Sequence, residues 1–407
     1  MAIVSSSGST SVFRLKNQAP IYLIGLGHGA THWIAATFYI LLPLLTKDLG
    51  LSYTEAGLLV SIFHFSSFAA NFGSGVVVDM TGRKVIFQVV SLVVGALALA
   101  VFGVTGLYVV LAAMVSLIGA TNNLWHPPAI AFISERYPDH RGYALSIHAS
   151  GASIGDMIAP TLVGILLISL TWQEAAAVST LPVFVVVAIF LFYLMPMDRT
   201  VPGAPRRGVG FGDYFKGLTQ LVRRRAVLGL CLMAAFRSMA QVGLVMFLPL
   251  YLFDVLKVSP WLMGLAITCM HLGGVIVSPI AGMMSDRVGR RPVVMAGLTA
   301  TTVLIVLLPF IPSATGFVVA VAALGFVLYA VRPVIHSWMM DLAPAEVSAS
   351  ATSLLFGTQA ALSVLMPLVG GVVADRYGLV EVFYVIAAIM LVANLTVVLL
   401  PRPEKAA

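Results

Sequence analysis

The sequence predicts an all-α membrane protein with twelve transmembrane helices arranged as two pseudo-symmetric six-helix bundles. Three observations support this fold class: the composition, the long apolar segments and an internal repeat. Of the 407 residues, 60% are hydrophobic and only 10% are charged, whereas about 25% of the residues of a soluble domain are charged. The net charge of +7 is distributed between the apolar segments, which predicts contact with a lipid bilayer and no nucleic-acid partner.

Twelve apolar segments are each long enough to cross a bilayer as a tilted helix. Their apolar residues run continuously, which excludes a membrane β-barrel with its alternating strands. Only helices satisfy the backbone of such segments in lipid. The segments are residues 20–46, 54–79, 85–104, 107–134, 142–168, 174–195, 226–254, 260–283, 292–312, 315–341, 346–372 and 379–400.

The lysines and arginines predict a multi-pass protein of the cell membrane (the inner or plasma membrane) with both termini in the cytoplasm. With this orientation eighteen basic residues lie inside, and the outer loops contain only Lys47, Lys257 and Arg376. The first residues lack the apolar stretch and cleavage site of a removable signal peptide. We expect cytoplasmic tails at 1–19 and 401–407, six-helix bundles at 20–195 and 226–400, and a basic cytoplasmic linker at 196–225.

The two halves of the chain repeat each other. Six residues recur 207 positions later, and four more recur 206 positions later. Such a repeat indicates duplicated bundles related by an axis along the membrane normal. The recurring residues of the first half are Gly57, His64, Gly75, Asp79, Gly82, Arg83, Gly119, Pro127, Pro138 and Gly164.

Two copies of a Gly-x-x-x-Asp-x-x-Gly-Arg motif occupy the predicted loops after the second and eighth segments. The copies contain Gly75, Asp79, Gly82, Arg83 and Lys84, and then Gly282, Asp286, Arg287, Gly289, Arg290 and Arg291. The motif resembles the signature loop of the major facilitator superfamily, and with the segments and the repeat this resemblance covers essentially the whole chain. It implies a latch of carboxylates and arginines at helix ends that holds the bundles in the outward-facing state. In the alternative interpretation, the basic residues only anchor the loops in the cytoplasm.

The fifth segment carries small residues and a proline at Gly151, Gly155, Pro160 and Gly164. This pattern resembles the helix-5 motif of the superfamily's antiporters, which favours efflux over uptake. Small residues four positions apart also let helices pack closely in a bilayer. Generic helix packing is therefore the alternative interpretation.

A second resemblance is to the fosmidomycin-resistance-like branch of the superfamily, which includes exporters of small anionic antibiotics. It depends on Asn122, Asn123 and the His126-Pro127 pair in the fourth segment, and on an Arg-Gly-x-Ala sequence at the start of the fifth. The first segment departs from the branch, because His28 and His32 are not followed by the usual Asn-Asp pair.

Ionisable side chains are costly inside a membrane and usually line a polar cavity. Segments three, six, nine and twelve have none in their interiors, which predicts that these four face lipid. For proton coupling we predict Asp156, the only acid near the membrane midplane, as the first carrier and His32 as the second, because carboxylates and imidazoles can exchange protons. The other candidates for proton coupling are His64, His271, His28 and His148.

Two arginines, Arg237 and Arg332, outnumber this single acid. We predict that they bind an anionic or zwitterionic substrate, because the guanidinium fork recognises carboxylate and phosphate groups. In the alternative interpretation, Arg332 bonds to backbone carbonyls or to Asp341. The further candidates for substrate binding are Gln241, His336, His126, Asn122 and Asn123.

The sequence therefore predicts a secondary active transporter that works by alternating access, and no enzyme, because it lacks the common catalytic motifs. The favoured function is proton-coupled efflux of a small anionic or zwitterionic organic compound or drug. Two alternatives stay open: proton-coupled uptake of an organic anion, and export of a metal or metal chelate by the midplane histidines. We expect a small-molecule substrate, protons and the bilayer as partners, a functional monomer, and neither a cofactor nor a metal site.

Overall fold

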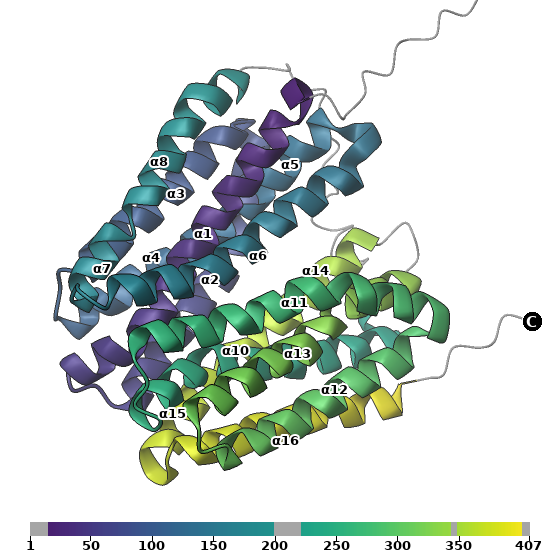
Figure 1. Ribbon diagram of the computed structural model, residues 1–407. Helices are drawn as coiled ribbons and strands as arrows, with labels where there is room; N and C mark the ends of the chain where they lie inside the picture. The colour runs from purple at the N-terminus through teal and green to yellow at the C-terminus, as the bar shows by residue number, and fades with distance from the viewer. Residues whose placement is uncertain (1–14, 199–220, 343–347, 401–407) are drawn as a thin grey trace, which may run out of the picture.

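The structure is a computed structural model that describes residues 15–198, 221–342 and 348–400, without the side chains of residues 15–17, 71–80, 139, 348–350 and 353. These residues are almost entirely helical (Figure 1). The first half contains α1 (Leu15–Asp48), α2 (Tyr53–Thr81), α3 (Lys84–Phe102), α4 (Tyr108–Leu124), α5 (His126–Arg136), α6 (Arg141–Leu166), α7 (Trp172–Val178) and α8 (Leu181–Ile189). The second half contains α10 (Arg225–Asp254), α11 (Pro260–Val288), α12 (Arg290–Leu307), α13 (Ala314–Leu342), α14 (Ser348–Ser363), α15 (Leu365–Tyr377) and α16 (Leu379–Leu399).

Each of the twelve apolar segments corresponds to one helix or to a pair of consecutive helices. Within the described residues, eleven spans are long and apolar enough to cross a membrane, and α2, with 29 residues, completes the set of twelve. The fourth, sixth and eleventh spans are each interrupted, between α4 and α5, α7 and α8, and α14 and α15. Prolines stand in the first turn after each break, at Pro127, Pro182 and Pro367, where the missing amide is not needed by the helix.

Several helix ends differ from the predicted boundaries. Helix α1 begins at Leu15, earlier than residue 20, and α11 continues to Val288, beyond residue 283. Most of the predicted linker, together with residues 1–14 and the tail at 401–407, lies outside the described residues.

The expectation that the whole signature motif forms a loop is wrong. Residues 75–81 and 282–288 are the last turns of α2 and α11, and the turn itself is made by Gly82 and Gly289, whose φ angles are +64° and +96°. Only glycine adopts such angles without strain. The two equivalent glycines therefore end the helices at matching positions of the two bundles.

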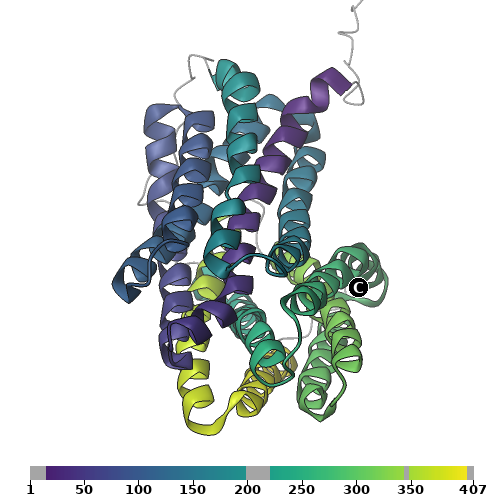
Figure 2. The same ribbon diagram turned by 60° about the vertical axis from the view of Figure 1, so that its left-hand side comes forward.

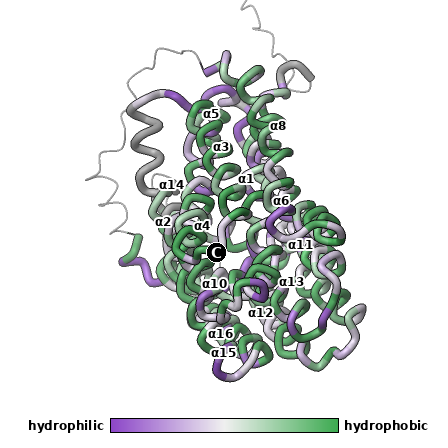
Figure 3. The backbone as a smooth tube through the Cα atoms, turned by 90° about the vertical axis from the view of Figure 1, so that its left-hand side faces the viewer, coloured by the Kyte–Doolittle hydropathy of each residue, from purple (hydrophilic) through white to green (hydrophobic). Residues whose placement is uncertain are grey.

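The outer helices present apolar side chains to the surroundings. Large apolar residues of α3, α8, α12 and α16 are exposed, among them Leu97, Val185, Val303 and Val398. Figure 3 shows hydrophobic residues along the length of the helices and hydrophilic residues mainly at their ends. This distribution is the one required of lipid-facing helices.

The two bundles meet at one end, and their helix axes diverge toward the end at which α1 begins and α16 ends (Figures 1 and 2). We call the meeting point the closed end. There α6 packs against α11, and α2 against α15. The backbone amides of Tyr53 and Thr54 donate hydrogen bonds of 2.8 and 2.9 Å to Asp375 of the other bundle.

Glycines allow the backbones to touch across the closed end. A Cβ atom added at Gly264 would meet the carbonyl oxygen of Pro160, and one added at Gly164 would lie 2.7 Å from the carbonyl oxygen of Pro260. The recurring pair Gly57 and Gly264 thus serves equivalent contacts, because Gly57 approaches the carbonyl oxygen of Pro367 in the same way. The closed end is held by backbone contact that larger residues would prevent.

We predict that Gly264→Ala weakens the closed end. The added methyl group must displace the backbone of Pro160, at a cost of about 1–3 kcal/mol. Spin labels on Ser169→Cys and Arg376→Cys, in a Cys231→Ser and Cys269→Ser background, should then show an additional, longer distance. The matched control is Gly357→Ala, where no atom lies within 4 Å of the new Cβ. Identical distance distributions in both variants would contradict the prediction.

Candidate transport site

A cavity of about 210 Å³ lies between the two bundles. Residues from α1, α2, α4 and α6 line one wall, and residues from α10, α11 and α13 line the other. It brings together six residues predicted for substrate binding or proton coupling, Pro160 of the helix-5 motif, and two tyrosines, Tyr39 and Tyr329, which the sequence analysis missed. The six predicted residues are His32, His64, Asn122, Asp156, Gln241 and His271.

The first wall is organised by a bond between two helices. His32 Nδ1 of α1 lies 2.9 Å from Asp156 Oδ1 of α6. These helices approach closely because Gly29 faces Gly151: a Cβ at Gly29 would lie 2.9 Å from the carbonyl oxygen of Gly151. Gly155 fits against the backbone of Gly29 in the same way. Helix α1 has no acid next to its histidines, and Asp156 of α6 supplies a carboxylate to His32 instead.

The predicted helix-5 motif has two faces in α6. Gly151 and Gly155 face α1, whereas the Pro160 carbonyl and Gly164 face α11 of the other bundle. Thr268 of α11 also donates a 2.6 Å hydrogen bond to the carbonyl oxygen of Met157. Helix α6 is therefore in close contact with both bundles, and Asp156 lies between these two sets of contacts.

The repeat-related histidines occupy equivalent places beside tyrosines. Tyr39 Oη lies 2.8 Å from His64 Nε2, and the ring of His271 lies 5.3 Å from that of Tyr329. All four side chains line the cavity. Each bundle therefore contributes one imidazole and one phenol to the wall.

Three further histidines of the first bundle, His28, His126 and His148, form a cluster beside the cavity. His28 Nδ1 donates a 2.7 Å hydrogen bond to the carbonyl oxygen of His148, and its Nε2 lies 3.2 Å from His126 Nε2. The rings of His28 and His148 stack at 3.9 Å. The indole of Trp125 donates a hydrogen bond of 3.2 Å to His148 Nε2. These histidines are linked to the cavity through His32, whose ring lies 4.9 Å from that of His28.

The two asparagines of α4 have different surroundings. Asn122 lines the cavity and donates a 3.4 Å hydrogen bond to the carbonyl oxygen of Thr31. Asn123 instead bonds to the carbonyl and hydroxyl oxygens of Ser67 in α2. Of the pair, only Asn122 is placed to contact a bound solute in this conformation.

The structure does not bring the two arginines to the cavity wall. Arg237 is only 3% exposed, and its Nη2 donates a 2.7 Å hydrogen bond to the carbonyl oxygen of Leu328. Gln241, one turn further along α10, does line the cavity. Arg332 is exposed and interacts electrostatically with Asp156 and His271.

The other groups considered with Arg332 are engaged elsewhere. The ring of His336 packs against Phe356 at 5.0 Å. Asp341, the alternative partner for Arg332, accepts a 3.0 Å hydrogen bond from Arg290 Nε.

The second signature copy forms a charge network within its own bundle. Arg290 pairs with Asp286 and Asp341, which joins α11, α12 and α13. Arg291 Nη2 donates a 2.7 Å hydrogen bond to the carbonyl oxygen of Val398 in α16. Arg287 is exposed.

The first copy uses acids that the sequence analysis missed. Lys84 Nζ lies 2.6 Å from Glu135 Oε2 at the end of α5, and Asp198 accepts 3.0 Å hydrogen bonds from the amides of Lys84 and Val85. The side chain of Asp79 is not among those that the structure describes. Asp198 is more than a hundred residues away along the chain, so no local pattern could have linked it to this motif.

A polar cavity between two helical bundles in a membrane is the architecture of a transporter. The chain belongs to the Major Facilitator Superfamily, whose family model matches residues 24–270 and 230–407. It is therefore a transporter rather than an enzyme, and a multi-pass membrane protein with a small-molecule substrate.

Relatives with different names cover most of the chain. The hexuronate transporter of Bacillus subtilis (strain 168) is 24% identical over 422 residues, which cover 95% of this chain and 96% of that protein. The multidrug efflux pump Tap of Mycolicibacterium fortuitum is 23% identical over 349 residues, covering 81% of this chain and 83% of the pump. The crystal structure of a bacterial homolog of the human lysosomal transporter Spinster, inward-facing and occupied, matches with a TM-score of 0.76 at 14% identity, covering 93% of this chain and 95% of that one. These similarities show the fold and the transporter class.

We predict that Asp198 stabilises the start of α3. A carboxylate that bonds to the first amides of a helix contributes about 0.5–2 kcal/mol, so Asp198→Ala should lower the melting temperature of the purified protein. Asp198→Asn should lower it less, because asparagine can accept the same hydrogen bonds. Glu381→Ala, which removes an exposed acid in the first turn of α16, is the control. Equal melting temperatures for Asp198→Ala and wild type would exclude this role.

Proposed function

We propose that the protein exports a small anionic or zwitterionic organic compound, or a drug of that charge, in exchange for protons. The observation that carries this proposal is the His32–Asp156 pair on the cavity wall, 2.9 Å apart and opposite the second bundle. Both groups can gain or lose a proton. They lie where a solute between the bundles would alter their surroundings.

Proton coupling follows from the connections of this pair. Asp156 is joined to α1 by His32, and α6 packs directly on α11 of the other bundle. Protonation of the carboxylate would weaken its bond to the imidazole, because the charge-assisted bond becomes a neutral one. A proton can thereby change the packing between α1 and α6, and through α6 the contact between the bundles.

The preference for an anion rests on the charges of the second bundle. Arg332 is exposed and interacts electrostatically with Asp156 and His271, which both line the cavity. Arg237 lies behind it in α10, with a backbone carbonyl as the acceptor of its guanidinium. Two permanent positive charges near one carboxylate favour an anionic solute.

We propose that transport runs outward. Efflux is supported by the helix-5 motif, by the resemblance to the fosmidomycin-resistance-like branch, and by the similarity to a pump named for multidrug efflux. With both termini in the cytoplasm, the closed end lies outside and the cavity would open inward, as a binding step for export requires.

We further propose that a monomer completes the transport cycle by alternating access. The bundles would rock about the cavity, opening the glycine contacts of the closed end while the other end closes. Asp79 and the network of Asp286 and Arg290 would then latch the cytoplasmic end. The pairs within the second bundle keep Arg290 positioned for that contact.

Uptake of an organic anion with protons is a second candidate. The charge of Asp156 acts on His271 and Arg332, so protonation of Asp156 would free these cations for an anion, and the two would bind together. The similarity to a hexuronate transporter agrees with this candidate. Accumulation in vesicles with an imposed pH gradient separates the two: an exchanger concentrates the solute in an acidic interior, and a cotransporter in an alkaline one.

We predict that Asp156→Asn abolishes this gradient-driven accumulation in proteoliposomes but retains exchange of labelled solute. Asparagine keeps the shape and one acceptor atom but cannot carry the proton. The solute is glucuronate or fosmidomycin, whichever raises the melting temperature of the purified protein. The matched control is Asp48→Asn, which changes an exposed acid that accepts a hydrogen bond from Trp172 within the first bundle. Full accumulation by the Asp156→Asn variant would remove Asp156 as the essential carrier.

We also predict that Arg332→Gln lowers the affinity for the same anion by at least about tenfold. A hydrogen bond to a charged group contributes about 1.5–3 kcal/mol. Arg332→Lys keeps the charge but loses the forked geometry of the guanidinium. Its affinity for the anion should therefore lie between those of wild type and Arg332→Gln. The control is Arg376→Gln, which removes an exposed arginine at the closed end. Titration calorimetry that gives equal affinities for Arg332→Gln and wild type would refute the anion site.

A further inference from the structure

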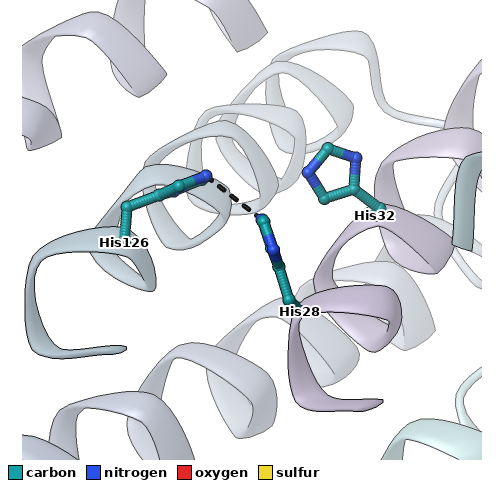
Figure 4. A group of neighbouring side chains, drawn as sticks. All are labelled: His28, His32 and His126. Atoms are coloured by element: carbon teal, nitrogen blue, oxygen red, sulfur yellow. Dashed lines mark hydrogen bonds between the residues drawn. The ribbon is translucent and has the colours of Figure 1, made fainter. Parts of the chain in front are cut away.

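Three histidines of the first bundle point toward one another in a way that the transport cycle does not require. His28 and His32 lie one turn apart on α1, and His126 begins α5 (Figure 4). One ring nitrogen from each lies within 4.8 Å of the other two. We propose that these imidazoles form a binding site for a divalent transition-metal ion of the Zn²⁺ class.

The distances are close to those that such an ion needs. Zn²⁺ binds imidazole nitrogen at about 2.0–2.1 Å, so two ligands of a tetrahedral site are about 3.4 Å apart. The Nε2 atoms of His28 and His126 are already 3.2 Å apart. Small side-chain rotations of His32 would bring the third nitrogen into range and leave a fourth position for water.

In two of the three rings, those of His28 and His32, a hydrogen bond on the far side fixes which nitrogen faces the cluster. The carbonyl oxygen of His148 can only accept, so His28 Nδ1 carries the proton and Nε2 carries a lone pair. Asp156 holds His32 Nδ1, which leaves Nε2 of that ring as the free ligand atom. A backbone carbonyl or a carboxylate behind a histidine is the usual support of a metal ligand.

The local charge suits a cation. Asp156, bonded to His32, adds a negative charge next to the three neutral rings. The groups that act electrostatically on His28 and His126 are other imidazoles, whereas Arg332 acts on Asp156, His271 and His336. The arginines therefore do not oppose the binding of a cation by His28 and His126.

The site has an entry path, because His32 also lines the cavity between the bundles. An ion can reach the cluster from the same space as the transported solute. Imidazole ligands without thiolates favour Zn²⁺, Ni²⁺ and Co²⁺ over Ca²⁺ or Mg²⁺. Binding here is independent of the proposed direction and solute of transport.

The test is a Co²⁺ titration of full-length protein without a histidine tag, after removal of metal by a chelator. Wild type should bind one Co²⁺ per chain with the visible absorption of a tetrahedral ion, and Zn²⁺ should displace it. His28→Asn and His126→Asn should each lower the affinity at least tenfold, and Asp156→Asn about 10–100-fold, as loss of a supporting group does. His140→Asn, an exposed histidine away from the cluster, should bind like wild type.

Two results would overturn the site: wild type without tetrahedral Co²⁺ absorption, or ligand variants that bind Co²⁺ like wild type. If one of the asparagine variants does not fold, Co²⁺ binding by the His126→Gln variant and the spectrum of the wild type still test the site. In a further measurement, Zn²⁺ should raise the melting temperature of wild type and of His140→Asn but not of His126→Gln. This test measures metal binding and no transport. Absence of the metal site would therefore not contradict the coupling role of Asp156, and failure of the coupling prediction would not contradict the metal site.

Discussion

The close approach of α1 and α6 is the contact on which the transport site depends. Gly29, Gly151 and Gly155 let the two backbones touch, and this spacing allows His32 to reach Asp156. A side chain at these glycines would separate the helices and leave the carboxylate unpaired inside the membrane, where an unpaired charge is very costly. The pairing of His32 with Asp156 therefore depends on the small residues at the contact of α1 with α6.

The same helix transmits the state of that pair to the other bundle. Beyond Asp156, α6 turns its Pro160 carbonyl and Gly164 toward α11, where glycine again permits backbone contact. The hydrogen bond from Thr268 to the carbonyl oxygen of Met157 adds a polar link at the residue next to Asp156. A shift of α6 against α1 must therefore also alter the closed end, which gives a physical route from protonation to bundle movement.

Several charged and polar side chains bond to acceptors of their own bundle. Arg237 uses the carbonyl of Leu328, and His28 uses that of His148. Lys84 and Arg290 at the helix ends use acids of their own bundle. Since these four groups bond within their own bundle, the bundles can move relative to one another without breaking these bonds. Among the described residues, the hydrogen bonds that join the two bundles and would change during such movement include those between α2 and α15 and between α6 and α11.

The sequence by itself determined the twelve helices, the duplication, and the histidines and the acid that line the cavity. Apolar length and backbone hydrogen bonding leave helices as the only solution in lipid, and ionisable residues are retained there only where they line a polar space. That is why His32, His64, Asp156 and His271 could be identified before the fold was known. The turns at Gly82 and Gly289 were also recognisable, although the helices run further into the motif than expected.

Only the tertiary structure decided which of these residues meet. His32 and Asp156 are 124 positions apart, and Lys84 and Asp198 are 114 apart, so no helical periodicity relates them. Arg237 and Gln241 share a helix face by spacing, yet only Gln241 reaches the cavity, because the packing of α10 against α13 gives Arg237 a carbonyl partner. Side-chain partners across helices are set by backbone approach, and that approach depends on the glycines of two helices at once.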